Sequence, residues 1–256
     1  MLKVRSDGGF FSTCSVRLMA LLQYFNKNSQ LPSAVDSSEQ FTWYKKNLLE
    51  DITFRYFIHY DDIPVEIKWV SHIVDYDRQF DNYKEIDYGQ VCPFIKKYFT
   101  PTPPIYEEAE RIASEYFLDY ESTCVLFYRG NDKITEVSLC TYDDMIEKAH
   151  EILSENPGIR FLIQSDETEF IHRMLEEFPT SIWFEKEVRH ISQQMGTVDL
   201  LLKDNIESFS KKFLAITLLM SRCKYVVCGT GNCSLWIAYY RGHADGMYQY
   251  LHDGWV

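Results

Sequence analysis

The sequence lacks the segments that would carry the chain to or across a membrane. Residues 1–5 do not form the apolar run of a signal peptide, and no stretch approaches the roughly 20 apolar residues of a membrane span. Basic residues are also scarce, because 26 Lys and Arg stand against 38 Asp and Glu, for a formal net charge of −12. Nucleic acids and anionic membranes need a clustered basic surface, so neither is expected as a partner. A small anionic ligand is compatible with this charge, since a few local cations can hold it.

The seven cysteines include no Cys-x-x-Cys pair. An odd number of unpaired thiols is typical of reduced proteins, so we expect the chain to be cytoplasmic. Cys223, Cys228 and Cys233 recur every five residues, a spacing that fits neither a zinc finger nor one face of a helix. We therefore predict no metal site at these cysteines, and we expect no metal ion and no bound cofactor elsewhere in the chain.

The composition is that of a globular protein. Hydrophobic residues make up 46% and aromatic residues 16% of the 256 positions, enough for one large domain or two of ordinary size. The clearest break is Thr100–Pro104, a proline cluster that we expect to form a stiff connector outside any helix. We therefore predict two domains, at residues 1–102 and 103–256.

The first domain is predicted to be small and irregular. Lys3–Arg5 has the pattern of a strand, and an apolar helical run over residues 16–25 follows it. Between them lie Gly8 and Gly9, which either allow a ligand to approach the backbone at a helix N-terminus or simply form a tight turn. Residues 30–98 contain only short aromatic-rich pieces, so no regular element is predicted there.

In the second domain, short buried strands alternate with helices. The strands are predicted at Cys124–Tyr128, Ile159–Ile163, Ser181–Phe184 and Tyr225–Val227. The helices are predicted at Ile105–Tyr116, Met145–Leu153, Phe170–Phe178, Ile206–Ser221 and Leu235–Tyr240. Thr141 and Asp144 form a capping box ahead of the second helix. Such alternation builds right-handed βαβ units, so we predict an α/β protein with a parallel, Rossmann-like sheet.

Three of the strands end in polar turns. The first turn contains Arg129 and Asp132, the second is Ser165-Asp166-Glu167, and the third is Gly229-Thr230-Gly231-Asn232-Cys233-Ser234. Ligands of open α/β sheets bind beyond the carboxyl ends of the strands. We therefore expect these turns to lie close together and to form one site.

The three turns have the chemistry of a nucleotide-diphosphate site. The glycines of the third turn expose backbone N–H groups ahead of a helix, and Arg129 adds a cation for the same phosphate. Asp166 or Glu167 can accept hydrogen bonds from a base such as guanine, or from ribose. Each turn taken alone is also explained as a solvated loop or a helix cap, and Asp166 as an N-cap. Because such turns follow strands in three successive βα units, a ligand site is favoured over these separate explanations. The predicted donor-binding residues are Arg129, Asp132, Ser165, Asp166, Glu167, Gly229, Thr230, Gly231, Asn232, Cys233 and Ser234.

The turns belong to three longer segments, Phe127–Glu136, Phe161–Glu167 and Met220–Gly229. The first resembles the motif His-Val-Arg-Arg-Thr-Asp-Lys, followed by a Glu, of the α1,6- and O-fucosyltransferases, a family of GT-B glycosyltransferases. The second is similar to that family's strand ending in Ala-Thr-Asp-Asp. The third is similar to its Leu-Ser-x-Ala-Asp-Phe-Leu-Val-Cys-Thr motif. The resemblance covers residues 120–242, about half of the chain, and the first domain shares only a glycine-containing first loop.

This resemblance implies a GT-B-like fold, with two Rossmann-like domains facing a cleft. It also implies that Arg129 holds the β-phosphate of a nucleotide sugar. Asp166 or Glu167 would read the base, and Gly229–Ser234 would surround the diphosphate and the sugar. The family's His is replaced by Phe127 and its second Arg by a glycine. The resemblance makes GDP-fucose the first choice of donor, and these two replacements make UDP-xylose or another UDP-sugar the second.

The mechanism implied is a single inverting displacement that needs no metal ion. Glu136 stands where the family has its catalytic base, and it would take the proton of a glycan hydroxyl that attacks the anomeric carbon. Lys133, Arg129 and the backbone amides of the third turn would stabilise the departing diphosphate. The acceptor glycan is expected in the cleft, in contact with aromatic side chains of the first domain and with Asp7, Gly8, Gly9, Phe10, Phe11 and Ser12.

Two other classes stay open at this stage. A non-catalytic nucleotide-sugar or glycan-binding module would keep Arg129 but would need no base, and Glu136 would then be a solvated residue. A phosphatase or kinase would use similar turns, but the chain has no Gly-x-x-x-x-Gly-Lys-[Ser/Thr] loop. Asp75-Tyr76-Asp77 has the Asp-x-Asp form that holds a metal in some glycosyltransferases, but so short a match arises by chance in an acidic chain.

Overall fold

A five-stranded sheet forms the framework of the carboxyl-side half, in the order β4-β3-β5-β6-β7. The computed structural model describes residues 1–67, 70, 79–186, 190–194, 196–201 and 205–256, so Asp75-Tyr76-Asp77 lies outside the described residues. The strands are β3 (Thr123–Tyr128), β4 (Arg160–Ser165), β5 (Tyr225–Cys228), β6 (Met247–Leu251) and β7 (Gly254–Trp255). The first four are parallel, and β7 forms an antiparallel hairpin with β6. The predicted parallel α/β sheet is confirmed.

The register of the sheet brings the three polar turns to one edge. Tyr128 of β3 pairs with Ser165 of β4, and Phe127 pairs with Cys228 of β5. These pairs stand at the carboxyl ends of their strands. Every residue of β3 is buried, as expected for a parallel strand with neighbours on both sides and helices on both faces. The turns that follow β3, β4 and β5 therefore emerge side by side.

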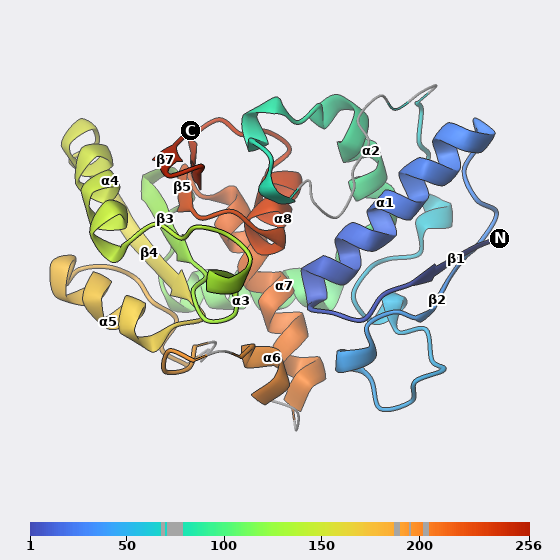
Figure 1. Cartoon of the computed structure of the whole chain (residues 1–256), viewed down its shortest axis with the longest axis horizontal. Coiled ribbons are helices and arrows are strands. Elements are labelled where there is room, and N and C mark those ends of the chain that lie inside the picture. Colours follow the sequence, from blue (N-terminus) through green and yellow to red (C-terminus); the bar gives the residue numbers. More distant parts are fainter. Residues whose placement is uncertain (68–69, 71–78, 187–189, 195, 202–204) are drawn as a thin grey trace.

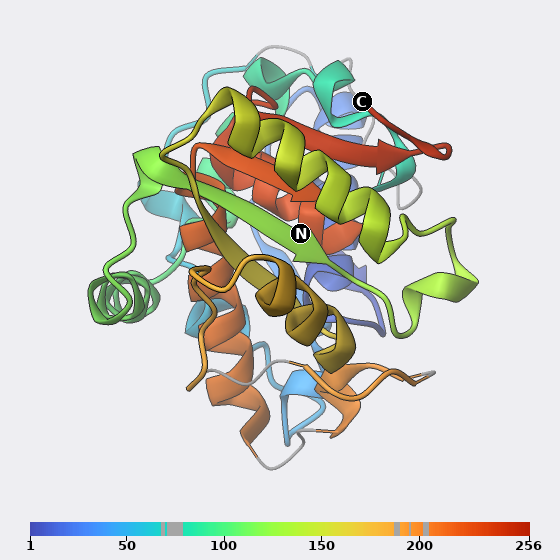
Figure 2. The same ribbon diagram turned by 90° about the vertical axis from the view of Figure 1, so that its left-hand side faces the viewer.

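Helices cover both faces of this sheet. The helices α4 (Tyr142–Glu155) and α5 (Thr168–Glu177) pack on the face to which Cys124, Leu126 and Tyr128 point. Figure 2 shows these two helices in front of the sheet. The opposite face is covered by α3 (Pro103–Glu115), α7 (Ile206–Arg222) and α8 (Asn232–Arg241). A short helix, α6 (Val198–Leu201), precedes α7.

The amino-side half contains one βαβ unit. Strands β1 (Leu2–Arg5) and β2 (Val35–Glu39) are parallel, and α1 (Phe10–Asn28) connects them. Figure 1 shows this unit on the opposite side of α7 and α8 from the larger sheet. A further helix, α2 (Tyr88–Tyr98), packs against α8. The prediction of no regular element in residues 30–98 is therefore wrong at β2 and α2.

The two halves share one hydrophobic core. Trp236 of α8 is 0% exposed, and its ring lies 5.8 Å from that of Phe11 in α1 and 4.8 Å from that of Phe99 after α2. Burying a side chain of this size contributes about 1.5–3 kcal/mol or more relative to leaving it exposed, so separating the halves is costly. The predicted domain boundary between residues 102 and 103 falls at the start of α3, and this core extends across it.

Three local predictions need correction. Pro103 and Pro104 do not lie outside a helix but form the first turn of α3, because a first-turn residue has no helical partner for an N–H group. Residues 181–184 are not a strand, since only Ile182 bridges to the sheet, at Leu162. The strand β6 was not predicted at all. By contrast, the predicted capping box of Thr141 and Asp144 is present at the start of α4.

Candidate functional site

Arg129 connects the three polar turns. It follows β3 directly, and its Nε donates to Asp166 Oδ2 in the second turn at 2.7 Å. Its Nη1 lies 3.0 Å from Cys233 Sγ in the third turn, and its Nη2 lies 3.0 Å from Asp132 Oδ1 in its own turn. Burial acts to lower the pKa of Arg129, but the carboxylate of Asp166 raises the pKa well above its ordinary range. The guanidinium is therefore a permanent charge at the meeting point of the turns.

Asp166 fixes the orientation of that guanidinium. Only 7% of its side chain is exposed, and its Oδ1 accepts from the backbone N–H of Gly130 at 2.9 Å. The backbone oxygen of Asp166 accepts from Asn131 Nδ2 at 2.7 Å. Asp166 is not the N-cap of α5, because that position is occupied by Glu167, which makes no capping bond with its side chain. The interpretation of Asp166 as a simple N-cap is wrong.

Glu167 lies behind the turn and is 1% exposed. Its Oε2 accepts from the Tyr142 hydroxyl at 2.5 Å, and its backbone N–H donates to Ser165 Oγ at 2.9 Å. A Cβ atom at Gly130 would lie 2.0 Å from Glu167 Oε1, so a larger residue at position 130 would collide with this carboxyl group. Burial raises the pKa of Glu167, and the charge of Asp166 adds to the increase. Glycine at position 130 is thus tied to the inward placement of Glu167.

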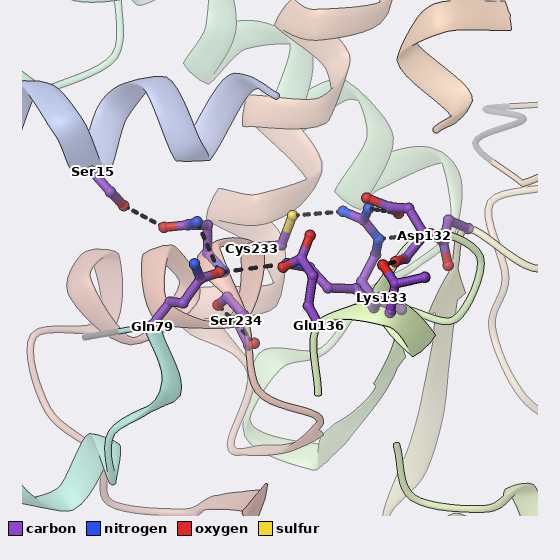
Figure 3. Close-up of polar contacts among 12 residues, drawn as sticks. Ser15, Gln79, Asp132, Lys133, Glu136, Cys233 and Ser234 are labelled. Carbon is purple, nitrogen blue, oxygen red and sulfur yellow. Dashed lines mark hydrogen bonds and ion pairs between the residues drawn. The ribbon is translucent and has the colours of Figure 1, made fainter. Parts of the chain in front are cut away.

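Lys133 begins the short 3-10 helix Lys133–Thr135, and it forms an ion pair with Glu136, the residue that follows this helix, with 2.5 Å between Nζ and Oε2. Lys133 is 7% exposed, whereas 34% of the Glu136 side chain is accessible. A Cβ atom at Gly231 would lie 3.3 Å from the Lys133 ε-carbon, and Gly231 has a φ of +154°. The glycine therefore lets the lysine lie directly against the third turn. Figure 3 shows the pair beside Cys233 and Ser234.

The third turn is bonded to the amino-side half. The backbone N–H of Gly231 donates to the Tyr83 hydroxyl at 3.1 Å, and that of Asn232 donates to Gln79 Oε1 at 3.1 Å. The prediction that backbone amides throughout Gly229–Ser234 face a diphosphate therefore needs correction, because two of them already have partners inside the protein. Ser234 Oγ donates to Gly229 O at 2.7 Å, and Thr230 Oγ1 donates to Tyr250 O at 2.7 Å.

Arg129 lines three neighbouring cavities. The first is a cleft of about 420 Å³ between the two halves, whose walls include all six predicted acceptor residues, Asp7, Gly8, Gly9, Phe10, Phe11 and Ser12, together with Asp132, Lys133, Glu136, Asn232 and Cys233. The second is lined by Phe127, Lys133, Gly229, Thr230, Gly231, Cys233 and Ser234. The third is lined by Phe127, Gln164, Ser165 and Asp166 from the ends of β3 and β4, and by residues of α6 and α7. The predicted donor turns and the predicted acceptor loop thus line cavities that share one guanidinium.

Among the described residues that line these three cavities are Ser165 and Asp166, but not Glu167. Of the two carboxylates that the resemblance implies for the base, Asp166 is the one at a cavity wall.

The described residues contain no group of three or more His, Cys, Asp or Glu side chains arranged to hold a metal ion. The helices that the structure describes are each too short or too polar to cross a bilayer.

Sequence reasoning missed several residues of the site. Trp43 lines the cleft and is half-buried, and the neighbouring Thr42 Oγ1 donates to Asp7 Oδ1 at 2.6 Å. Gln79 and Tyr83 hold the third turn from a distant part of the chain. No motif marks these positions. The sequence predicted that aromatic side chains of the first half contact the acceptor, but it did not identify Trp43 as one of them.

Comparison with known proteins places the whole chain in one fold. No protein-family model matches the sequence, and no curated protein matches it either. Solved structures do match. A NodZ α-1,6-fucosyltransferase soaked with GDP-fucose has a TM-score of 0.57 at 10% identity, over 97% of this chain and 94% of that chain. The fucosyltransferase NodZ from Bradyrhizobium has a TM-score of 0.54 at 12% identity, over 94% of this chain and 92% of that chain.

A NodZ structure co-crystallised with GDP is similar too, with a TM-score of 0.53 at 9% identity, over 94% of this chain and 91% of that chain. At these identities the likeness establishes the fold, which is the predicted GT-B-like fold of the fucosyltransferases. The motif resemblance covers about half of the chain, whereas the structural likeness extends through the amino-side half as well.

Proposed function

We propose that this protein is a glycosyltransferase that moves a sugar from a nucleotide diphosphate to a glycan hydroxyl. The observation that carries the proposal is the position of Arg129, which lines the cleft and contacts both the Asp166 turn and Cys233 of the third turn. GDP-fucose is the first choice of donor, since structures of the same fold were obtained with GDP-fucose and with GDP. A UDP-sugar such as UDP-xylose is the second.

The donor diphosphate is proposed to bind against the guanidinium of Arg129. Asp166 holds Nε, so the edge carrying Nη1 and Nη2 is turned toward Cys233 and Asp132 at the cleft. A guanidinium oriented in this way is suited to two oxygens of one phosphate. Lys133 adds a second positive charge beside Gly231. With two amides of the third turn already bonded, these two cations carry most of the proposed stabilisation.

Transfer is proposed to be a single displacement with inversion. The acceptor oxygen forms a bond to the anomeric carbon while the bond from that carbon to the diphosphate oxygen breaks. Glu136, which lines the cleft and is partly accessible, takes the hydroxyl proton. The electron pair leaves with the diphosphate, whose growing charge faces Arg129 and Lys133. Because these two residues supply positive charge at the leaving group, the reaction is proposed to need no metal ion.

The acceptor is proposed to lie along Asp7–Ser12 in the cleft. Phe10 and Phe11 are 1% exposed and shape the wall, whereas Trp43 presents a half-buried ring. An indole face and a neighbouring carboxylate suit the apolar face and hydroxyl groups of a sugar.

The protein is proposed to work in the cytoplasm. All seven cysteines are free thiols, which supports a cytoplasmic setting.

The deciding experiment compares transfer and nucleotide binding in the same preparations. The wild type and Glu136→Gln are incubated with GDP-fucose or UDP-xylose and a panel of oligosaccharides, with and without a metal chelator. We expect transfer by the wild type in both conditions, a loss of about 100-fold or more in Glu136→Gln as general-base contributions predict, and unchanged affinity of both proteins for the nucleoside diphosphate.

The exposed Glu147 of α4 provides the matched control, as Glu147→Gln removes the same charge far from the cleft and should leave transfer intact. Nucleotide binding without transfer to any acceptor would indicate a non-catalytic binding module instead. Release of inorganic phosphate without sugar transfer would indicate a phosphatase.

A further inference from the structure

A buried side chain of the amino-side half holds the third turn. Gln79 is 0% exposed, and its Oε1 accepts from the backbone N–H of Asn232 at 3.1 Å and from Asn232 Nδ2 at 2.9 Å. The same oxygen accepts from Lys133 Nζ at 3.4 Å. Figure 3 shows these bonds meeting at the Gln79 amide. One oxygen atom thus connects the start of α8 to the lysine at the proposed leaving group.

Asn232 is fixed from its other side by α1. Its Oδ1 accepts from Ser15 Oγ at 2.6 Å, and Ser15 Oγ in turn accepts from Trp236 Nε1 at 2.9 Å. Ser15 and Asn232 are 1% and 5% exposed, so water does not compete for these bonds. The side chain of Asn232 therefore has a single orientation, with Gln79 on one side and Ser15 on the other.

Lys133 is held by two acceptors that lie in different directions. Glu136 is partly accessible at the cleft, whereas Gln79 is buried behind the third turn. A lysine side chain has a flexible four-carbon stem, so one acceptor alone leaves it several positions. With both acceptors present, the ammonium group stays against Gly231, where a departing diphosphate is proposed to be.

We propose that Gln79 is a positioning residue for the leaving-group site. It does not line the described cavities, so its role is to place Lys133 and the first turn of α8. This inference rests on the proposed function. It adds that the amino-side half is required for donor chemistry as well as for acceptor binding, because Gln79 and Ser15 both come from that half.

The test is a double-mutant cycle on kcat for sugar transfer, with Gln79→Leu, Lys133→Met and the double variant. Leu fills much of the same space as Gln, but its side chain is one atom shorter and has no acceptor oxygen. Each single change should lower kcat by about tenfold or more, and the double variant should be no slower than the slower single variant. Residues that act through one another give such non-additive effects, whereas independent effects multiply.

Two further variants separate positioning from general support of the fold. Gln79→Glu keeps an acceptor oxygen at the same place and should restore most of kcat. Thr230→Val is the matched control, since the Thr230 hydroxyl lies in the same turn but bonds to Tyr250 O and Gln249 Nε2 rather than to Gln79 or Lys133, and its effect should multiply with that of Lys133→Met. If Gln79→Leu does not fold, Gln79→Asn, which withdraws the same oxygen by one carbon, replaces it in the cycle.

Multiplying effects of the Gln79 and Lys133 substitutions, or no rescue by Gln79→Glu, would overturn the inference. Both outcomes presuppose a wild type that binds nucleoside diphosphate and transfers sugar. A wild type that does neither would refute the proposed function itself, so the two failures are distinguishable.

Discussion

Replacing Arg129 by methionine removes the charge on which the proposed donor site depends. Methionine keeps most of the length of the side chain but has no group to bind phosphate. A hydrogen bond to a charged group contributes about 1.5–3 kcal/mol. At about 1.4 kcal/mol for each tenfold change, the affinity for a nucleoside diphosphate should fall roughly 10- to 150-fold. Asp132 and Asp166 would be left beside the site without their cation and would repel the diphosphate further.

The same substitution also destabilises the fold, and this effect must be separated from binding. Asp166 has a side chain only 7% exposed and would lose its charged partner. Removing one member of a buried ion pair costs about 3–5 kcal/mol, and the partial exposure of Arg129 places the expected loss at the lower end. The double variant Arg129→Met/Asp166→Asn removes the buried unpaired carboxylate and leaves only that of Asp132, whose side chain is 28% exposed. It should regain much of the thermal stability but none of the affinity.

The assay is calorimetric titration of GDP and UDP into the wild type, both Arg129 variants and a control, at one fixed salt concentration. Arg111→Met is a suitable control because Arg111 lies on the exposed surface of α3, paired with Glu108 and Glu115. Its affinity should equal that of the wild type. Nucleotide binding of wild-type strength in Arg129→Met would refute the assignment of Arg129 to the phosphate.

Three further predictions concern single side chains around the site. Burial raises the pKa of Glu167 above its ordinary 4.5, so the folded state holds this proton more tightly than the unfolded state does. The stabilising contribution of this protonated carboxyl group is complete below pH 4.5 and is lost as the pH rises through the folded-state pKa. Melting curves from pH 4 to pH 8 should show this loss of stability in the wild type and not in Glu167→Gln. An equal pH dependence of the two proteins would contradict the prediction. Trp43→Ala should raise the KM for the acceptor roughly 2- to 10-fold, as expected for one aromatic contact, with the KM for the donor unchanged; a change in the donor KM alone would place Trp43 elsewhere in the reaction. Alkylation of Cys233, whose Sγ contacts Arg129, should abolish nucleotide binding. Saturating GDP should protect the Cys233 thiol from alkylation, as measured by peptide mapping. Labelling of Cys233 at the same rate with and without GDP would count against a diphosphate at this turn.

The carboxyl-side half was predictable because its signals are local. The strand Cys124–Tyr128 is a short, fully apolar run, and Thr141 with Asp144 marks the start of α4 by neighbouring bonds alone. Parallel strands of similar length align their carboxyl ends, so the meeting of the Arg129, Asp166 and Cys233 turns follows from topology. These features need no information from distant parts of the chain.

The residues that support the site from the amino-side half were not predictable in the same way. Gln79 bonds to Asn232 across 153 positions of sequence, and a single glutamine in an irregular segment carries no periodic signal. The same holds for the inward placement of Glu167, which depends on Gly130 in another unit of the sheet. Pro103 and Pro104 were misread because prolines disfavour the interior of a helix but favour its first turn.

The position of a bound diphosphate is the most direct test of the central claim. Crystals of the protein soaked with GDP should show the β-phosphate within hydrogen-bonding distance of the Arg129 guanidinium, against the turn that contains Gly231 and Cys233. The sugar side of the phosphate should face the cleft that Glu136 lines. A diphosphate bound away from Arg129, or on the other face of the sheet, would contradict the account.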